Sequence, residues 1–243
     1  MSVVSYDSFA PETIRFGPVS KNSYGGSYVP FQTPTGGNLY LKIMTPPMVV
    51  PFGVSTSKFD ADNYYIEPSF RGEDPEVLKF HESMKAFDQH LLEAAVANAA
   101  EWFPKKKLPD DPVLKASILD SPDCHKTIVK PPRDPKWGDK LVTKARITPD
   151  GGIDCKFFDA DRNPVAKDDV PQKCTMRLVI EASNVFLSTT GWGVTWRVRQ
   201  AQIIGGVDAM QPLADCAFTV VTAGGGGSLD GGSLDDVGAG AFV

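Results

Sequence analysis

The feature that most constrains the fold is a run of segments in the second half of the chain where apolar and polar side chains alternate. This period of two is typical of half-buried β-strands. The segments are His125–Lys130, Lys140–Thr148, Gly152–Asp159, Cys174–Ser183 and Val194–Ile204. In the last segment, part of GWGVTWRVRQAQII, Trp196 and Val198 share the face of Trp192 and Val194, while Arg197 and Arg199 share the other.

One long helix is predicted before these strands. Asp74 followed by Pro75 has the pattern of an N-cap with proline at the first helical position, and Pro104 ends the pattern after Trp102. Apolar residues at helical spacing are Leu78, Met84, Phe87, Leu91, Leu92, Ala95 and Ala99. Shorter strands are expected at Asn38–Met44 and Asn63–Ser69, and the Pro-rich passage between them allows only an edge or interrupted strand.

The order of these elements predicts a mainly β fold with one long helix. A few strands, a helix and then a run of strands are typical of an OB-fold-like, five-stranded barrel, expected to occupy residues 37–222. Residues 1–36 are rich in Gly, Ser, Pro and Tyr without a sustained period, which predicts a flexible N-terminal arm. Residues 223–243 are a Gly-rich acidic segment, which predicts a disordered tail.

Charge is polarised along the chain. The net charge is −5, yet the five acidic residues from Asp208 onward account for all of it, because that stretch has no Lys or Arg. Residues 102–146 carry eleven Lys and Arg against six Asp. A basic middle predicts an anionic partner, and an acidic end predicts a tail that competes with that partner.

Several other protein classes are disfavoured. No apolar run approaches the roughly 20 residues of a membrane span, and the first residues lack a secretory signal, so an intracellular protein without a membrane partner is expected. The cysteines have no metal-ligand spacing and are expected to be reduced thiols. No phosphate-binding loop, nucleophile elbow or zinc-protease motif occurs. We therefore predict no enzymatic activity, no catalytic residue, no metal and no cofactor.

Single-stranded nucleic acid is held by cations on its phosphates and by aromatic rings on its bases. The predicted strands place basic residues opposite the apolar face, where neighbouring strands would form a basic stripe. The candidate DNA-binding residues are Lys130, Arg133, Lys136, Trp137, Lys140, Lys144, Arg146, Lys156, Phe158, Arg177, Arg197 and Arg199. Strand alternation predicts that one of Phe157 and Phe158 is exposed. Trp192 has valine neighbours that favour the core, with base stacking as the alternative.

Four segments together resemble a known family. They are the helix end EWF (Glu101–Phe103), KTIVKPPRD, FFDADRNPV and GWGVTWRVRQAQI. Their order over roughly residues 38–207 is similar to the phage-type single-stranded DNA-binding proteins, in the branch of large nucleo-cytoplasmic DNA viruses of algae and protists. The resemblance implies an OB-fold that coats and protects single-stranded DNA during viral replication, recombination and repair. It also implies a tail that recruits polymerase, primase or helicase, at the positions of Asp230, Asp235, Asp236 and Phe242.

Alternatives remain open at this stage. A β-rich viral structural or scaffolding protein without nucleic-acid binding also fits the Gly-rich ends and the neutral body. Single-stranded RNA stays open as a ligand, because a stacking groove rejects RNA only where it meets the 2′-hydroxyl. A homodimer also stays open. If the protein is viral, the host nucleus or a cytoplasmic virus factory is the expected location.

Overall fold

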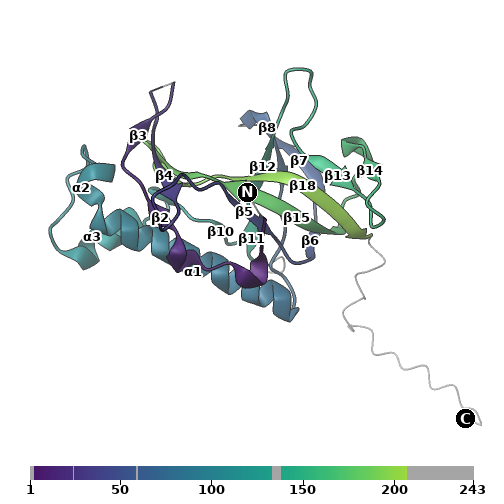
Figure 1. Ribbon diagram of the computed structural model, residues 1–243, viewed down its shortest axis with the longest axis horizontal. Coiled ribbons are helices and arrows are strands. Elements are labelled where there is room, and N and C mark those ends of the chain that lie inside the picture. The colour runs from purple at the N-terminus through teal and green to yellow at the C-terminus, as the bar shows by residue number, and fades with distance from the viewer. Residues whose placement is uncertain (1–2, 24, 59, 133–137, 207–243) are drawn as a thin grey trace, which may run out of the picture. The chain divides into compact units, whose positions relative to one another are not determined.

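The computed structural model describes residues 3–23, 25–58, 60–132 and 138–206, and the fold is mainly β with few helices (Figure 1). No helix in these ranges is long and apolar enough to cross a membrane. The helices are α1 (Pro75–Ala97), α2 (Ala99–Trp102) and α3 (Pro112–Leu119). Single 3₁₀ turns occur at Tyr6–Ser8, Pro11–Thr13 and Lys167–Asp169. The predicted tail, residues 223–243, lies outside the described residues.

The main sheet has the strand order β1-β5-β15-β18-β12-β8-β7, with β6 also on β15, β13 on β18, and β14 on β13. Its strands are β1 (Val4–Ser5), β5 (Leu41–Met44), β6 (Met48–Val50), β7 (Val54–Ser57), β8 (Asp60–Ile66), β12 (Thr143–Arg146), β13 (Lys156–Phe158), β14 (Pro164–Val165), β15 (Cys174–Ala182) and β18 (Trp196–Gly205). The β15–β18 ladder is antiparallel, whereas β12 pairs with β18 in parallel.

A second sheet has the order β2-β4-β16-β17-β9, with β3 also on β4, and β10 pairs with β11. Its strands are β2 (Arg15–Phe16), β3 (Ser20–Lys21), β4 (Ser27–Gln32), β9 (His125–Lys126), β16 (Asn184–Ser188) and β17 (Gly191–Val194); the separate pair is β10 (Val129–Lys130) and β11 (Lys140–Leu141). The segment predicted as one strand, Val194–Ile204, is therefore divided. Val194 ends β17 of the second sheet, and β18 of the main sheet begins at Trp196.

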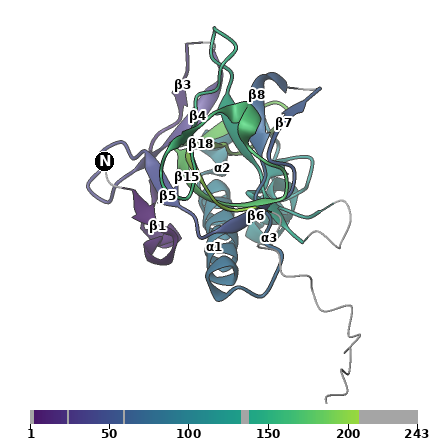
Figure 2. The ribbon, with the colours of Figure 1, turned by 90° about the vertical axis from the view of Figure 1, so that its right-hand side faces the viewer.

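Helix α1 covers the core side of the strands (Figures 1 and 2). Its start is confirmed, since the Asp74 side chain accepts a hydrogen bond from the Glu76 amide and Pro75 is the first helical residue. Its buried residues are Val77, Phe80, Met84, Phe87, Leu91 and Ala95. The predicted stripe is wrong at Leu78, which is 42% exposed, because Val77 takes the buried position in the first turn. The Phe87 ring packs edge-on against Phe31 and Trp196.

A further helix, α3, follows the polar stretch KKKLPDDP at residues 105–112, where the sequence analysis predicted no helix. Asp111 caps it by accepting from the amides of Val113 and Leu114, and Pro112 opens it. This is the same Asp-Pro signal that predicted α1. The prediction of one long helix is therefore confirmed only in part: α1 is the long helix, and the shorter α2 and α3 were not predicted, although the local signal for α3 was present in the sequence.

The prediction of a flexible arm at residues 1–36 is also wrong. Strand β4 pairs antiparallel with β16, so Val29 lies opposite Val185, and both are buried. Phe9 and Ile14 are buried as well, and the Phe9 ring packs against Phe87 of α1 at 5.6 Å. These apolar side chains find partners far away in the sequence, which a local pattern does not show.

The predicted five-stranded barrel is wrong in its closure, because the ladders among the described residues form an open sheet running from β1 to β7. A barrel would need a ladder between β6 and the segment that follows β8. In the described part of the chain these two are joined only by the isolated bridge Val49–Ser69, with a further bridge at Ser69–Lys140. Pro51 and Pro68 flank this gap. Proline lacks the amide N–H that a continuous ladder needs, so pairing there is limited to single bridges.

Candidate nucleic-acid interface

A row of polar side chains crosses the face of the main sheet opposite the core. We call it the central row, and strand register defines it: Ser55, Tyr65, Lys144, Arg197, Glu181 and Lys42 lie side by side on β7, β8, β12, β18, β15 and β5. The residues that follow Lys144 and Arg197, Ala145 and Val198, are buried, which confirms the predicted alternation. The three strands predicted to carry a basic stripe, β12, β15 and β18, are therefore neighbours.

Carboxylates partly neutralise this stripe. Lys144 pairs with Asp60 at 2.8 Å, and Lys140 with Glu67 at 2.7 Å. Arg199 is held from two sides, by Glu181 at 2.8 Å and by Asp154 at 2.6 Å. Each of these cations can meet a phosphate only in competition with its carboxylate. The sequence did not predict the partners, because they lie on other strands or loops.

The Asp60 carboxylate holds Lys144 in place. Burial by itself would raise the pKa of Asp60, but hydrogen bonds from Lys144, Tyr65 and Asn63 outweigh it and hold the pKa well below its usual value. The Tyr65 hydroxyl donates to Asp60 at 2.6 Å, and the Lys144 ammonium also lies 5.3 Å from the centre of the Tyr65 ring. Lys144 is thus fixed between an anion and an aromatic face.

Arg197, the next residue in the central row, pairs with no carboxylate among the described residues. Its Nη1 atom is buried and forms no hydrogen bond within the described part of the chain. Burial lowers the pKa of Arg197, and the nearby charges of Arg199 and Arg146 lower it further. A buried donor without an acceptor costs about 1–3 kcal/mol. An oxygen of a bound anion would supply the missing acceptor.

Arg197 lies in a continuous groove made of three adjoining hollows, with volumes of about 370, 290 and 250 Å³. The first two share Tyr40, Ser183 and Asn184, the last two share Thr195, and the first and last share Phe186. We call this the central groove. Its cations are Lys126, Lys130, Lys144, Arg197 and Arg199, and its aromatic residues at the surface are Tyr28, Tyr40 and Phe186.

The aromatic residues of the groove were missed by the sequence analysis. Phe186 lies opposite Tyr28 in the β4–β16 ladder, so the two rings share one face, and Tyr40 is 50% exposed. The signal was available in the sequence, because neighbouring residues of a strand point to opposite faces. Leu41, Val185 and Leu187 are buried, so Tyr40 and Phe186 point outward. The groove therefore combines cations with rings, the two requirements for holding an unpaired strand.

The other predicted cations fall in different places. Lys130 is half-buried in the central groove, where burial lowers its pKa. Arg146 and Lys156 are exposed, and Arg177 and Phe158 line a separate hollow. Seven predicted residues lie outside the described ranges: Arg133, Lys136, Trp137, Asp230, Asp235, Asp236 and Phe242.

The alternative of base stacking by Trp192 is wrong. Its side chain is 1% exposed and its ring stacks on His125 with centroids 4.1 Å apart. The indole Nε1 donates to the carbonyl of Leu119 at 3.1 Å, which ties β17 to the end of α3. The expectation that one of the two phenylalanines is exposed is met only in part, since Phe157 is buried and Phe158 is half-buried.

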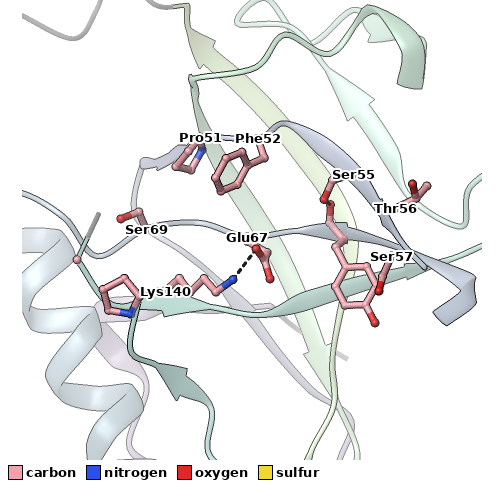
Figure 3. A pocket seen from close by; sticks show the side chains of 11 residues that line it. Pro51, Phe52, Ser55, Thr56, Ser57, Glu67, Ser69 and Lys140 are labelled. Atoms are coloured by element: carbon pink, nitrogen blue, oxygen red, sulfur yellow. Dashed lines mark hydrogen bonds and ion pairs between the residues drawn. The ribbon is translucent and has the colours of Figure 1, made fainter. Parts of the chain in front are cut away.

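A cavity of about 500 Å³ lies at the end of the central row. Ser55 and Tyr65 of the central row also line this cavity, together with Phe52. Figure 3 shows the Lys140–Glu67 ion pair within it. Polar and aromatic surface thus continues from the central groove past Lys144.

The described residues contain no group of three or more His, Cys, Asp or Glu side chains that could hold a metal ion. Cys124, Cys155 and Cys174 are buried, and none of them forms a disulfide in this part of the chain.

No protein-family model matches the chain, and no curated protein matches it. Among solved structures it is similar to gp2.5, a single-stranded DNA-binding protein encoded by bacteriophage T7, at 11% identity and a TM-score of 0.44, over 78% of this chain and 100% of that chain. It is also similar to a single-stranded DNA-binding protein from bacteriophage Enc34. The C-terminally truncated form has 10% identity and a TM-score of 0.39, and the form in complex with ssDNA has 9% and 0.38; both cover 79% of this chain and 96% of that chain. This is a distant likeness, and we draw the function from the geometry of the groove.

Proposed function

We propose that this protein binds single-stranded DNA across the outward face of its main sheet, along the central groove. The observation that carries the proposal is Arg197, whose side chain lines an open, polar hollow while its buried Nη1 has no acceptor in the described part of the chain. A phosphate oxygen in that hollow would accept from the guanidinium once the side chain turns Nη1 toward it. Lys130 and Lys126 would contact neighbouring phosphates from the other wall.

The rings of the groove favour an unpaired strand over a duplex. Tyr40 and Phe186 offer ring faces at the surface, and such faces stack on bases whose own faces are exposed. In a duplex the bases are already stacked on one another and turn only their edges outward. Stacking of this kind is tolerant of sequence, which suits a protein that coats DNA without enzymatic action.

The biological setting belongs to the same proposal. We infer that the protein protects single-stranded DNA during replication, recombination and repair of a viral genome. The tail at 223–243 would recruit polymerase, primase or helicase through Asp230, Asp235, Asp236 and Phe242. The basis for this is the family resemblance of the sequence together with the acidic composition of the tail.

A salt-dependent titration with oligo-dT tests the proposal, with duplex DNA and oligo-rU measured beside it. We expect tighter binding to oligo-dT than to the duplex, and an affinity that falls linearly with salt on logarithmic axes. Equal affinity for duplex and single strand, or binding to neither, would contradict it. The same titration on a chain lacking 223–243 should show stronger DNA binding and lost capture of the replication partner; unchanged values would leave the tail without this role.

One observation favours the second candidate, a scaffolding protein. Helix α3 exposes the apolar side chains of Val113, Leu114 and Ile118, at 74%, 58% and 44%. An exposed apolar cluster is typical of a surface that meets another protein. A scaffolding protein would leave its tryptophan fluorescence unchanged on addition of oligo-dT, whereas the proposed DNA-binding protein changes it.

A further inference from the structure

Another hollow of about 250 Å³ lies on the same outward face, beside the end of the central groove at Arg199. Strand register shows how it is built. Phe158, Gln202 and Arg177 lie side by side on β13, β18 and β15. In the next row toward the central groove, Gln200 lies between Lys156 and Val179. The loop between β13 and β14 adds Arg162 to the wall of the hollow.

The loop that carries Arg162 is held in one conformation by hydrogen bonds. The Asp159 carboxylate accepts from the backbone amide of Asn163 at 2.8 Å and from its side chain at 3.0 Å. Gln202 donates from the floor of the hollow to the carbonyl of Ala160 at 3.2 Å. Arg162 itself has a left-handed backbone, with φ of 69°. A non-glycine residue in this region is uncommon, and here the surrounding bonds hold it there.

The two arginines of this hollow differ from the cations of the stripe. Lys140, Lys144 and Arg199 each pair with a carboxylate. Arg162 and Arg177 form no ion pair with a carboxylate within the described ranges, although both line the same hollow as the half-buried ring of Phe158. Two unneutralised guanidinium groups and one ring face, with two glutamine amides between them, match the phosphate and the base of one nucleotide.

We propose that this hollow is a second nucleotide site, which takes a phosphate and its base from the same DNA strand that fills the central groove. The proposal rests on the proposed function. Arg199 of the central groove and Gln200 of the hollow are consecutive residues of β18, so the hollow adjoins the end of the groove; from Thr195 to Gln202 the two together extend over seven residues, about 23 Å. The Arg199–Glu181 and Arg199–Asp154 ion pairs lie at the end of the groove next to the hollow. A strand several nucleotides long would reach the second site, and a short one would fill the central groove alone.

The test compares two substitutions that make the same chemical change. Arg162 and Lys173 are the non-glycine residues with positive φ in the described ranges, both are exposed cations, and glycine accepts the conformation of each. Lys173 does not line the hollow. Arg162→Gly and Lys173→Gly are each titrated with oligo-dT of about 16 and about 4 nucleotides, the range of site sizes for a single such domain. Melting temperatures confirm that both variants are folded.

We expect Arg162→Gly to bind the long oligomer several-fold more weakly, with its salt slope reduced by about one, and Lys173→Gly to match the wild type. Both variants should bind the short oligomer like the wild type. Phe158→Leu should weaken binding of the long oligomer about fivefold or more. Equal affinities of the two glycine variants for the long oligomer would overturn the second site. So would a loss of affinity of Arg162→Gly for the short oligomer that equals its loss for the long one. Wild-type protein that binds neither oligomer overturns the proposed function itself.

Discussion

Lys144 lies directly opposite Arg197 in the parallel ladder of β12 and β18, and the fold treats the two cations differently. Lys144 donates to Asp60, whereas the Nη1 atom of Arg197 is buried without an acceptor in the described part of the chain. Asp60 therefore neutralises Lys144 within the protein, whereas Arg197 keeps a hydrogen-bond donor that a bound anion could use. We expect Arg197 to be the main phosphate contact of the central groove.

Replacing Arg197 by methionine removes the guanidinium group and keeps an apolar stem of similar length. Affinity for oligo-dT should fall, and the slope of log affinity against log salt should decrease by about one, since one phosphate contact is lost. The free energy of unfolding should not fall, because a buried unsatisfied donor is removed. Arg15→Met, at an exposed site on β2, serves as the control. An unchanged salt slope in Arg197→Met would refute the assignment.

Under the proposed function, Asp154 should compete with DNA for Arg199. Asp154→Asn removes one of the two negative charges that hold this guanidinium, while Glu181 keeps it in place. Affinity for oligo-dT should increase, and stability should change by less than about 1 kcal/mol because the Asp154 side chain is half exposed. Asp110→Asn, an exposed carboxylate before α3, is the matched control. Equal affinities of the two variants would show that Arg199 does not contact DNA.

Tyr40 and Phe186 should contribute through stacking. Changing either to alanine should weaken oligo-dT binding by about 1–3 kcal/mol for each base that loses its ring. Calorimetric titration against Leu114→Ala, which removes an exposed apolar side chain from α3, separates stacking from a general loss of apolar surface. If all three variants bind like the wild type, the bases do not lie in this groove.

Asp60 should make stability depend on acid pH. The pKa of its carboxyl is lowered in the folded state, so its contribution is fully present above the unfolded value and is lost as pH falls toward the folded value. The free energy of unfolding should therefore drop between about pH 5 and pH 2. In Asp60→Asn this drop should be smaller. A wild type and a variant with parallel pH profiles would show that Asp60 contributes no pH dependence.

Trp192 should affect stability and not binding. Trp192→Phe leaves the Leu119 carbonyl without its indole donor, which should destabilise the fold by about 1–3 kcal/mol. Affinity for oligo-dT should stay at the wild-type value, because the ring is buried on His125. Denaturant unfolding and a titration on the same sample measure both. A selective loss of affinity would place Trp192 in the interface after all.

Local patterns predicted much of the interface. Alternation correctly assigned Lys144, Arg177 and Arg197 to the face opposite the core, since Ala145, Leu178 and Val198 beside them are buried. The Asp-Pro signal located the start of α1, and the same signal at Asp111 would have located α3. Tyr40 and Phe186 followed the same alternation but lay outside the segments that the predicted basic stripe covered.

The ion pairs were beyond local prediction. Asp60 and Lys144 are 84 residues apart, and Glu67 and Lys140 are 73 apart. Nothing in the sequence around a lysine shows which distant carboxylate will reach it. The same limit explains the error about residues 1–36, whose apolar side chains pack against α1 and β16.

The sequence by itself determined which face of each strand a side chain occupies and where the main helix begins, because strand alternation and helix capping depend only on neighbouring residues. Only the tertiary structure decided that β12, β18 and β15 are adjacent, that carboxylates neutralise Lys144 and Arg199, and that Arg197 and Arg162 are left without one in the described ranges. Charge neutralisation depends on distances between residues that are remote in the chain. For that reason the basic stripe was predictable, and the cations within it that are left without a carboxylate in the described ranges were not.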